Sequence, residues 1–321
     1  MQPLISILIP VYNGAPYIEQ CLDSVISQSY QNIEILVSDN CSTDNTVDLI
    51  KSPKYTHVRL LVKDDNIGFQ KNVHSLISTA NGDYAIILCA DDFWHSDDLL
   101  SSYVTNMNND NIAFQFSSIK YLNEFNNSTY IDSPNYPSFL DGKNFFSGAM
   151  ATGTPMLSCV LFNLKHAVDS QIFRENMDFS PDVVAWFKLS LLGNVIYNDG
   201  CFATYRWVST NLTNSMTIEH KYDDEVLGHH IITNFAKDKL SQSEIDSWYV
   251  TRHNVINILY LVRIYKSYIN DDVSKTKVFD SINFVRTKTP HNLKFYIFLL
   301  LIYFLLVFPP KLSKHIFELR K

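Results

Sequence analysis

The stretch ILCADDFW, residues 87–94, decides the fold, because an apolar run that begins at Tyr84 ends here on two adjacent carboxylates, Asp91 and Asp92. Like charges repel, so a strand ends on such a pair only where another charge offsets the repulsion. The structural alternative is that the pair caps the helix expected after Ser96, although Ser96 already suits that cap. The pair therefore points first to a bound cation.

Three further apolar runs precede this one, and segments of helical period alternate with them. The runs cover residues 5–11, 33–37 and 58–62. The clearest helical segment begins near Pro16, and a second one covers residues 69–80. This alternation predicts βαβ units, and hence an α/β fold with a mostly parallel sheet and flanking helices.

Composition narrows the functional classes. The 321 residues are 46% hydrophobic, and 26 basic against 33 acidic residues give a net charge of −7. We therefore expect a globular protein that binds no nucleic acid. Five cysteines without a CxxC pair argue against a zinc site and a disulfide framework, so a reducing compartment is expected. The first twelve residues lack a basic start, and we read them as a strand and not a signal peptide.

Polar clusters follow the strands and should converge. PVYNG (10–14), SDNCSTDNT (38–46) and ADD (90–92) each follow an apolar run, and ligands of such sheets lie beyond the carboxyl ends of the strands. Turn and helix-cap chemistry is the alternative for the second cluster.

Mg²⁺ takes one or two carboxylates and completes its shell with water and phosphates. Neither GxGxxG nor GxxxxGK[ST] is present, so a bound diphosphate would rely on the metal.

Residues 6–46 and 65–94 carry a set of motifs that is specific in combination. These are PVYN, SDNCSTD, the N-x-G of DNIG, the ANGDY strand entry and CADD. Together they resemble the family 2 glycosyltransferases, which are inverting enzymes of GT-A fold. The resemblance is strong over about 100 residues and patchier to about residue 215.

The resemblance implies a donor site and a metal site. Asp91 and Asp92 would hold the ribose and a divalent cation, Mg²⁺ or Mn²⁺. Two departures from the family pattern are Asn40 in place of a second Asp, and Cys89 in place of the first Asp of D-x-D-D. The residues implied to bind the nucleotide sugar are Pro10, Tyr12, Asp39, Asn40, Lys71, Asn72, Asp91 and Arg206.

The second half of the chain should supply the general base and an arginine that can face the diphosphate. In MDFSPDVVAWFKLSLLGN, residues 177–194, Ser180 is the expected cap of a helix, and Asp182 is the implied base, with Asp178 as the second choice. The alternative is that Asp182 only favours the positive end of the helix. ATYRWVSTN, residues 203–211, resembles a closing Y-R-x-H element, in which Arg206 can face the diphosphate and Val208 replaces the histidine.

The C-terminal third is expected to be helical. We expect a catalytic domain over residues 1–215, divided near residue 100 into nucleotide and acceptor halves, a helical extension over 216–290 and an apolar tail over 291–321. A long helix is predicted for residues 244–269, with Trp248, Val255, Ile258, Leu259 and Val262 buried. The 14-residue apolar run 295–308 is short for a span and has basic flanks, so it predicts a peripheral or monotopic anchor. A core helix and a marginal span are alternatives.

The resemblance implies transfer of a sugar from a UDP- or dTDP-sugar to a lipid-linked saccharide. Surface polysaccharide synthesis, such as that of O-antigen or capsule, at the cytoplasmic face of the inner membrane is the expected setting. A sugar-nucleotide pyrophosphorylase and a catalytically degenerate membrane scaffold are the alternatives. Acceptor specificity is expected to depend on a long loop at residues 122–137.

Overall fold

The computed structural model describes residues 2–106, 111–148, 154–209, 211–270 and 273–288. Its contacts divide the chain into two compact units, Met1–Asn214 and Ser215–Lys321. Each unit is described by itself.

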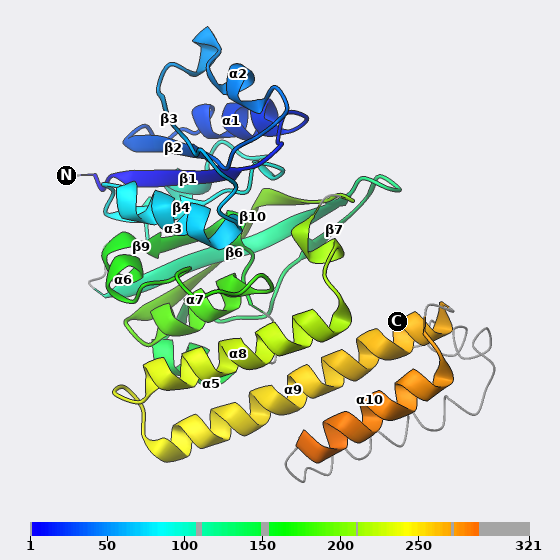
Figure 1. Cartoon of the computed structure of the whole chain (residues 1–321). Helices are drawn as coiled ribbons and strands as arrows, with labels where there is room; N and C mark the ends of the chain where they lie inside the picture. The colour runs from blue at the N-terminus through cyan, green and yellow to red at the C-terminus, as the bar shows by residue number, and fades with distance from the viewer. Residues whose placement is uncertain (1, 107–110, 149–153, 210, 271–272, 289–321) are drawn as a thin grey trace. The chain divides into compact units, whose positions relative to one another are not determined.

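The first unit is built on one sheet, drawn in Figure 1. Its strands are β1 (Ile5–Val11), β2 (Ile33–Asp39), β3 (Val58–Val62), β4 (Tyr84–Ile87), β5 (Phe93–Trp94), β6 (Ile112–Asn123), β7 (Ser128–Asp132), β8 (Phe139–Leu140), β9 (Val160–Asn163) and β10 (Asn194–Trp207). The order is β3-β2-β1-β4-β9-β6-β10-β5, with β7 beside β6 and β8 beside β10. Strands β1 to β4 pair in parallel, as do β6 and β10. Strands β5, β7, β8 and β9 run antiparallel to their neighbours, so the sheet is mixed where mostly parallel pairing was expected.

Helices cover both faces of this sheet (Figure 1). The odd-numbered residues of β1 pack into a core shared with α1 (Ile18–Ile26), α2 (Thr46–Ile50) and α4 (Leu99–Val104). The other face carries α3 (Phe69–Thr79), α5 (Gly142–Gly148), α6 (Leu164–Asp169) and α7 (Pro181–Ser190). Short 3-10 turns cover Pro53–Tyr55, Leu157–Cys159 and Leu212–Asn214. The α/β class is thus confirmed, because both faces of β1 are buried.

The expected long loop at residues 122–137 is a hairpin as far as Asp132, and only residues 133–137 lack regular structure. Strand β7 pairs antiparallel with β6, and every residue of β7 is exposed. The composition NEFNNST is polar because the turn and the strand β7 that follows it are exposed to solvent. Tyr121 and Tyr130 stack across the hairpin with ring centroids 4.6 Å apart.

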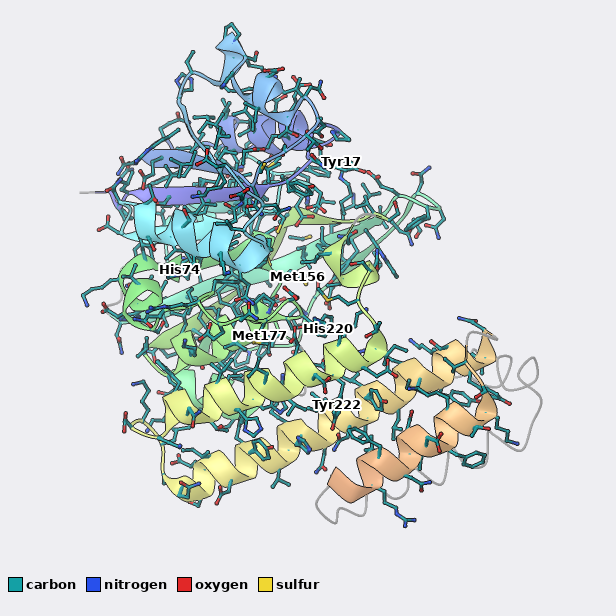
Figure 2. The ribbon with its side chains drawn as sticks, in the orientation of Figure 1. Tyr17, His74, Met156, Met177, His220 and Tyr222 are labelled. Atoms are coloured by element: carbon teal, nitrogen blue, oxygen red, sulfur yellow. The ribbon has the colours of Figure 1, made fainter. Side chains whose placement is uncertain are left out.

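The second unit contains α8 (Ile218–Ala236), α9 (Gln242–Ile269) and α10 (Lys275–Lys288). Helix α9 begins with a capping box between Ser241 and Glu244. The Tyr222 hydroxyl of α8 donates to Asn257 of α9 at 2.9 Å, and Figure 2 marks Tyr222. The expected buried face of α9 was partly wrong: Leu259 is 39% exposed, whereas Tyr260, Leu261, Ile264 and Tyr265 form the core with α10.

Among the described residues, no helix is both long and apolar enough to cross a membrane. The apolar run 295–308, for which an anchor was predicted, lies outside the described residues.

Candidate active site

The two adjacent aspartates lie between β4 and β5, beside the end of β10. A turn places them, because the Asp92 N–H donates to the Cys89 carbonyl at 2.9 Å. Asp92 is 2% exposed. The Ser158 hydroxyl donates to its Oδ2, and the Arg206 N–H donates to its Oδ1 at 2.9 Å. Both oxygens of Asp92 are therefore bonded to the protein.

Asp91 faces a more open environment. Its side chain is half-buried and accepts no hydrogen bond from another described residue. Burial raises the pKa of Asp91, and burial together with the Asp91 charge raises the pKa of Asp92 well above its usual range. A bound cation would offset this repulsion, because it stabilises both ionised carboxylates.

Cys89, Asp91 and Asp92 offer ligand atoms that lie within 4.8 Å of one another. Burial and the two aspartates raise the pKa of the Cys89 thiol well above its usual range. A protonated thiol is a poor ligand for a hard cation, and carboxylates are good ones. The donor set therefore fits Mg²⁺ or Mn²⁺ held chiefly by Asp91, with water and phosphate oxygens completing the shell.

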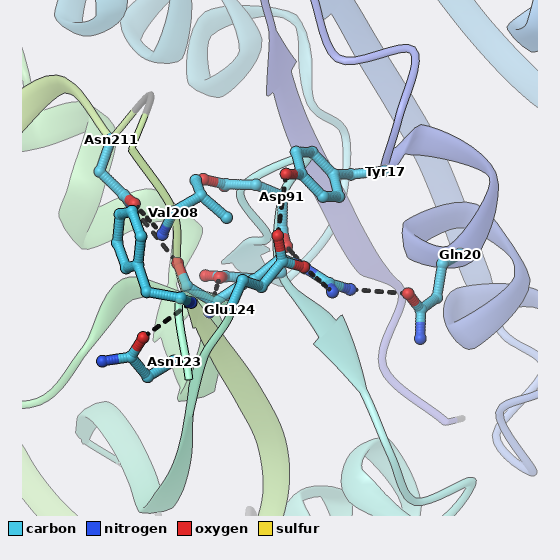
Figure 3. A network of polar contacts seen from close by, with 10 residues as sticks. Tyr17, Gln20, Asp91, Asn123, Glu124, Val208 and Asn211 are labelled. Carbon is cyan, nitrogen blue, oxygen red and sulfur yellow. Dashed lines mark hydrogen bonds and ion pairs between the residues drawn. The ribbon is translucent and has the colours of Figure 1, made fainter. Parts of the chain in front are cut away.

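Arg206 is 7% exposed and its guanidinium is surrounded by protein groups. Nε donates to the Asp91 carbonyl at 2.8 Å, and the terminal nitrogens donate to Glu124 Oε1 and Gln20 Oε1, both at 2.6 Å. Figure 3 shows Tyr17, Gln20, Asp91 and Glu124 gathered in this network. Arg206 thus lies beside the aspartate pair, and each nitrogen of its guanidinium donates to a protein group; its contact with a diphosphate stays a prediction.

Val208 is buried and fixes the chain that follows β10. Its N–H donates to Asn211 Oδ1 at 2.6 Å, and its carbonyl accepts from the Asn214 amide at 2.8 Å. Figure 3 shows Val208 and Asn211 beside the network. Val208 stands where the family 2 pattern has a histidine, and in this chain its backbone N–H and carbonyl hold the segment after β10 in place.

Asp182 lies in the first turn of α7, after Pro181. Burial raises its pKa to about 6. Ser180 precedes the helix as predicted, but it adopts a left-handed conformation with φ of 55° and its side chain makes no cap bond. Asp178 is exposed.

The charges of three carboxylates act on the hydroxyl of one tyrosine. Burial, followed by the charges of Asp92, Asp91 and Asp182, raises the pKa of the Tyr205 hydroxyl. Asp182 also acts on Cys89. Asp182 and the aspartate pair therefore lie within electrostatic range of the same side chains, although the segment after β4 and α7 lie far apart in the sequence.

The predicted nucleoside residues lie at the ends of β1 and β2. Pro10 is buried within β1, and Tyr12 just beyond it is 50% exposed. Asp39 is 1% exposed, and one carboxylate oxygen accepts from the Ser42 N–H at 2.9 Å. Its other oxygen, Oδ1, is buried without a partner among the described residues. Asn40 bonds through both amide atoms to the segment before α3, at Asn66 and Ile67.

The two predicted residues on α3 differ in their surroundings. Lys71 is exposed. Asn72 is buried, and both its amide atoms bond Ser38: Oδ1 accepts from the hydroxyl at 2.6 Å and Nδ2 donates to the carbonyl at 2.9 Å. Asn72 therefore joins α3 to β2, and its expected place at the flank of the nucleotide site stays a prediction.

Sequence reasoning missed three residues near the site. Ser158 bonds Asp92, and Glu124 bonds Arg206. Gln70, in the first turn of α3, is 8% exposed, and both its amide atoms lack a partner among the described residues. No local pattern marks Ser158 or Glu124, but a glutamine in the apolar-spaced first turn of a predicted helix was a readable signal.

Comparison with known proteins defines the class. The chain resembles the S. aureus TarS fragment 1–349 solved with UDP-GlcNAc, with a TM-score of 0.61, 16% identity and coverage of 90% of this chain and 93% of that one. It also resembles the mannosyltransferase PcManGT of Pyrobaculum calidifontis, solved with GDP-Man and Mn²⁺, with a TM-score of 0.60, 14% identity and coverage of 97% and 82%. These likenesses establish a glycosyltransferase fold of the GT-A kind.

The family follows from the sequence match. Residues 6–163 match the model of glycosyl transferase family 2, so the chain carries a glycosyltransferase domain of that family. TuaG of Bacillus subtilis, to which a role as a teichuronic acid biosynthesis glycosyltransferase is assigned, is 25% identical over 217 residues, which are 67% of this chain and 83% of TuaG.

Proposed function

We propose that this protein is an inverting glycosyltransferase that moves a sugar from a UDP- or dTDP-sugar to a lipid-linked saccharide. The proposed setting is synthesis of a surface polysaccharide such as O-antigen or capsule. Similarity to TuaG, to which a role in teichuronic acid biosynthesis is assigned, supports the polysaccharide. The TarS structure with UDP-GlcNAc supports the nucleotide sugar.

The observation that carries the proposal is the group of ligand atoms of Cys89, Asp91 and Asp92 within 4.8 Å of one another, with the buried carboxylate of Asp182 close enough for its charge to raise the pKa of the Cys89 thiol. A base and a metal-binding carboxylate near one another match the two ends of a displacement at a sugar carbon. Asp182 takes the proton of the acceptor hydroxyl, whose oxygen forms the new bond to the sugar carbon. The bond from that carbon to the diphosphate oxygen breaks, and the electron pair leaves with the nucleoside diphosphate. Divalent Mg²⁺ or Mn²⁺, when bound, neutralises the charge of the diphosphate.

The donor site is proposed at the ends of β1, β2 and α3. The unpaired Asp39 Oδ1 would accept from the N3–H of uracil or thymine, because a buried carboxylate oxygen without a donor is costly in the free protein. Tyr12 is exposed enough to cover the base. Lys71 is proposed for the edge of the site, and Gln70 offers an unpaired amide to the donor.

We further propose that the protein works at the cytoplasmic face of the inner membrane, as a peripheral or monotopic protein. The sequence supports this with its 14-residue apolar run at 295–308 and the basic residues on both sides. An acceptor that is linked to lipid would then lie at the same surface.

The test replaces the base. Asp182→Asn should lower kcat for sugar transfer by about 10²–10⁴-fold, while UDP affinity stays nearly unchanged, because donor binding uses other residues. Asp178→Asn, at an exposed position, is the matched control and should transfer normally. If Asp178→Asn is inactive and Asp182→Asn is active, the base is misassigned. If the wild-type protein releases no UDP from any UDP-sugar and binds no nucleotide, the proposed function fails.

A further inference from the structure

We propose that Glu124 is a positioning residue for this transfer: acting through Arg206, it holds Asp91 and Asp92 in the arrangement that a divalent cation requires. The inference rests on the proposed function and goes beyond it. Glu124 follows the last residue of β6, in the segment that the sequence presented as an ordinary polar loop.

Arg206 contacts both aspartates through different atoms. Its side-chain Nε donates to the Asp91 carbonyl at 2.8 Å, which fixes the backbone that carries the Asp91 carboxylate. Its backbone N–H donates to Asp92 Oδ1 at 2.9 Å. Displacement of Arg206 would therefore move the turn at residues 89–92 and free one oxygen of Asp92.

Glu124 fixes Arg206 in turn. Its Oε1 lies 2.6 Å from an Arg206 terminal nitrogen, and its Oε2 accepts from the Tyr17 hydroxyl at 3.1 Å. Gln20 accepts from the other terminal nitrogen at 2.6 Å. The guanidinium carbon lies 5.0 Å from the centroids of both the Tyr17 and Phe93 rings. Glu124 thus completes the set of contacts that holds the guanidinium in one orientation (Figure 3).

The charges of this group are consistent with a cation. The group contains three carboxylates, Asp91, Asp92 and Glu124, and one guanidinium, that of Arg206, which among the described residues forms an ion pair with Glu124 alone, so the ionised group carries two unbalanced negative charges. A divalent cation balances them. Arg206 lies between Glu124 and the aspartate pair. Glu124 therefore affects cation binding by holding Arg206 in place, and not as a ligand of the cation.

The experiment measures Mn²⁺ binding without donor, from the resonance signal of free Mn²⁺, together with thermal unfolding. Glu124→Ala should weaken Mn²⁺ affinity by about 10–100-fold, the usual effect of losing a partner that orients a metal ligand. Glu124→Gln should recover most of the affinity, because an amide keeps an acceptor for Arg206 and a polar partner for Tyr17. Asp132→Ala, at an exposed position on β7 of the same hairpin, is the control and should bind Mn²⁺ as the wild type does.

Three outcomes decide the proposal. Unchanged Mn²⁺ affinity in a folded Glu124→Ala variant overturns it. Equal losses in Glu124→Ala and Asp132→Ala also overturn it, because the effect then belongs to the hairpin as a whole. If Glu124→Ala does not fold, Gln20→Ala removes one bond from Arg206 and no charge, and weaker Mn²⁺ binding by that variant supports the proposal while unchanged binding overturns it. A wild type that binds Mn²⁺ but transfers no sugar contradicts the proposed function alone.

Discussion

Asp91 and Asp92 are neighbours in the chain, but their surroundings give them different tasks. Asp92 is buried with both oxygens bonded to protein donors, so its loss would leave the Ser158 hydroxyl and the Arg206 N–H without a partner. Asp91 accepts no hydrogen bond from another described residue, so its carboxylate is available for a ligand. Substitutions of these two adjacent aspartates should therefore have different effects on metal binding and on stability.

Asp91→Asn should lower metal-dependent UDP affinity by about 10-fold or more, with little change in thermal stability. Asp92→Ala should instead destabilise the fold by about 1–3 kcal/mol, the usual cost of leaving a buried donor unpaired. Calorimetry of UDP with and without Mn²⁺, beside thermal unfolding, checks both variants. Full metal-dependent affinity in Asp91→Asn would place the cation elsewhere.

The pH dependence of transfer should report Asp182. A general base must be ionised to accept a proton, and burial raises the pKa of Asp182 to about 6. We expect kcat to level off above this pH and to fall about tenfold per pH unit below it. UDP affinity measured over the same pH range separates Asp182 from the aspartate pair. A kcat that stays constant down to pH 4 would rule out this base.

At the scale of elements, α3 depends on a polar contact with the sheet. Asn72 bonds Ser38 with both ends of its amide, inside the interface between α3 and β2. Asn72→Ala leaves the buried hydroxyl and carbonyl of Ser38 without this partner and should lower the free energy of unfolding by about 1–3 kcal/mol. Denaturant unfolding measures it, with the exposed Lys71→Ala as control, expected within about 0.5 kcal/mol of wild type.

A different result would support the nucleotide-site role that the motif implied for Asn72. If Asn72→Ala leaves stability unchanged but weakens UDP binding, Asn72 belongs to the nucleotide site and its contact with Ser38 is incidental. Lys71→Ala tests its own assignment in the same measurement, because a loss of UDP affinity without a loss of stability supports Lys71 at the edge of the donor site.

The sequence predicted elements well where one physical signal dominates. Strands β1 and β3 and helix α3 match the expected ranges within a residue, because each is an apolar run or a clear helical stripe bounded by turn residues. The hairpin at residues 122–132 was predicted as a loop, since a strand such as β7, whose residues are all exposed, has the composition of a loop. The buried face of α9 was partly misjudged because aromatic residues on both sides of the helix gave no sharp stripe.

At the scale of the whole molecule, the site was predictable only in part. Adjacent carboxylates at a strand end and an aspartate at a helix start are local patterns, and the resemblance assigned roles to both. Ser158 and Glu124 gave no such signal, because their importance comes from partners 66 and 82 residues away in the chain. The resemblance likewise could not show that Arg206 bonds to protein groups.

Removal of the C-terminal tail should separate donor chemistry from membrane binding. A chain ending at residue 290 should keep UDP binding and donor hydrolysis but lose binding to anionic lipid vesicles and transfer to a lipid-linked acceptor. Vesicle sedimentation and UDP release are the measurements. Replacing Lys311, Lys314, Arg320 and Lys321 by Gln in the full chain should weaken vesicle binding in a salt-dependent way. A shortened chain that binds vesicles as before would contradict the anchor.

The bond between the Arg206 N–H and Asp92 also has a consequence for synthesis on the ribosome. The two residues are 114 positions apart, and β10, which carries Arg206, pairs with β6 and β5. While only the first hundred residues have emerged, the nascent chain contains nearly every recognisable motif but lacks the partner that orients its aspartates. Long-range contacts of this kind form late, because the intervening chain must first be ordered. The growing polypeptide should therefore acquire its cation affinity only after β10 has left the exit tunnel.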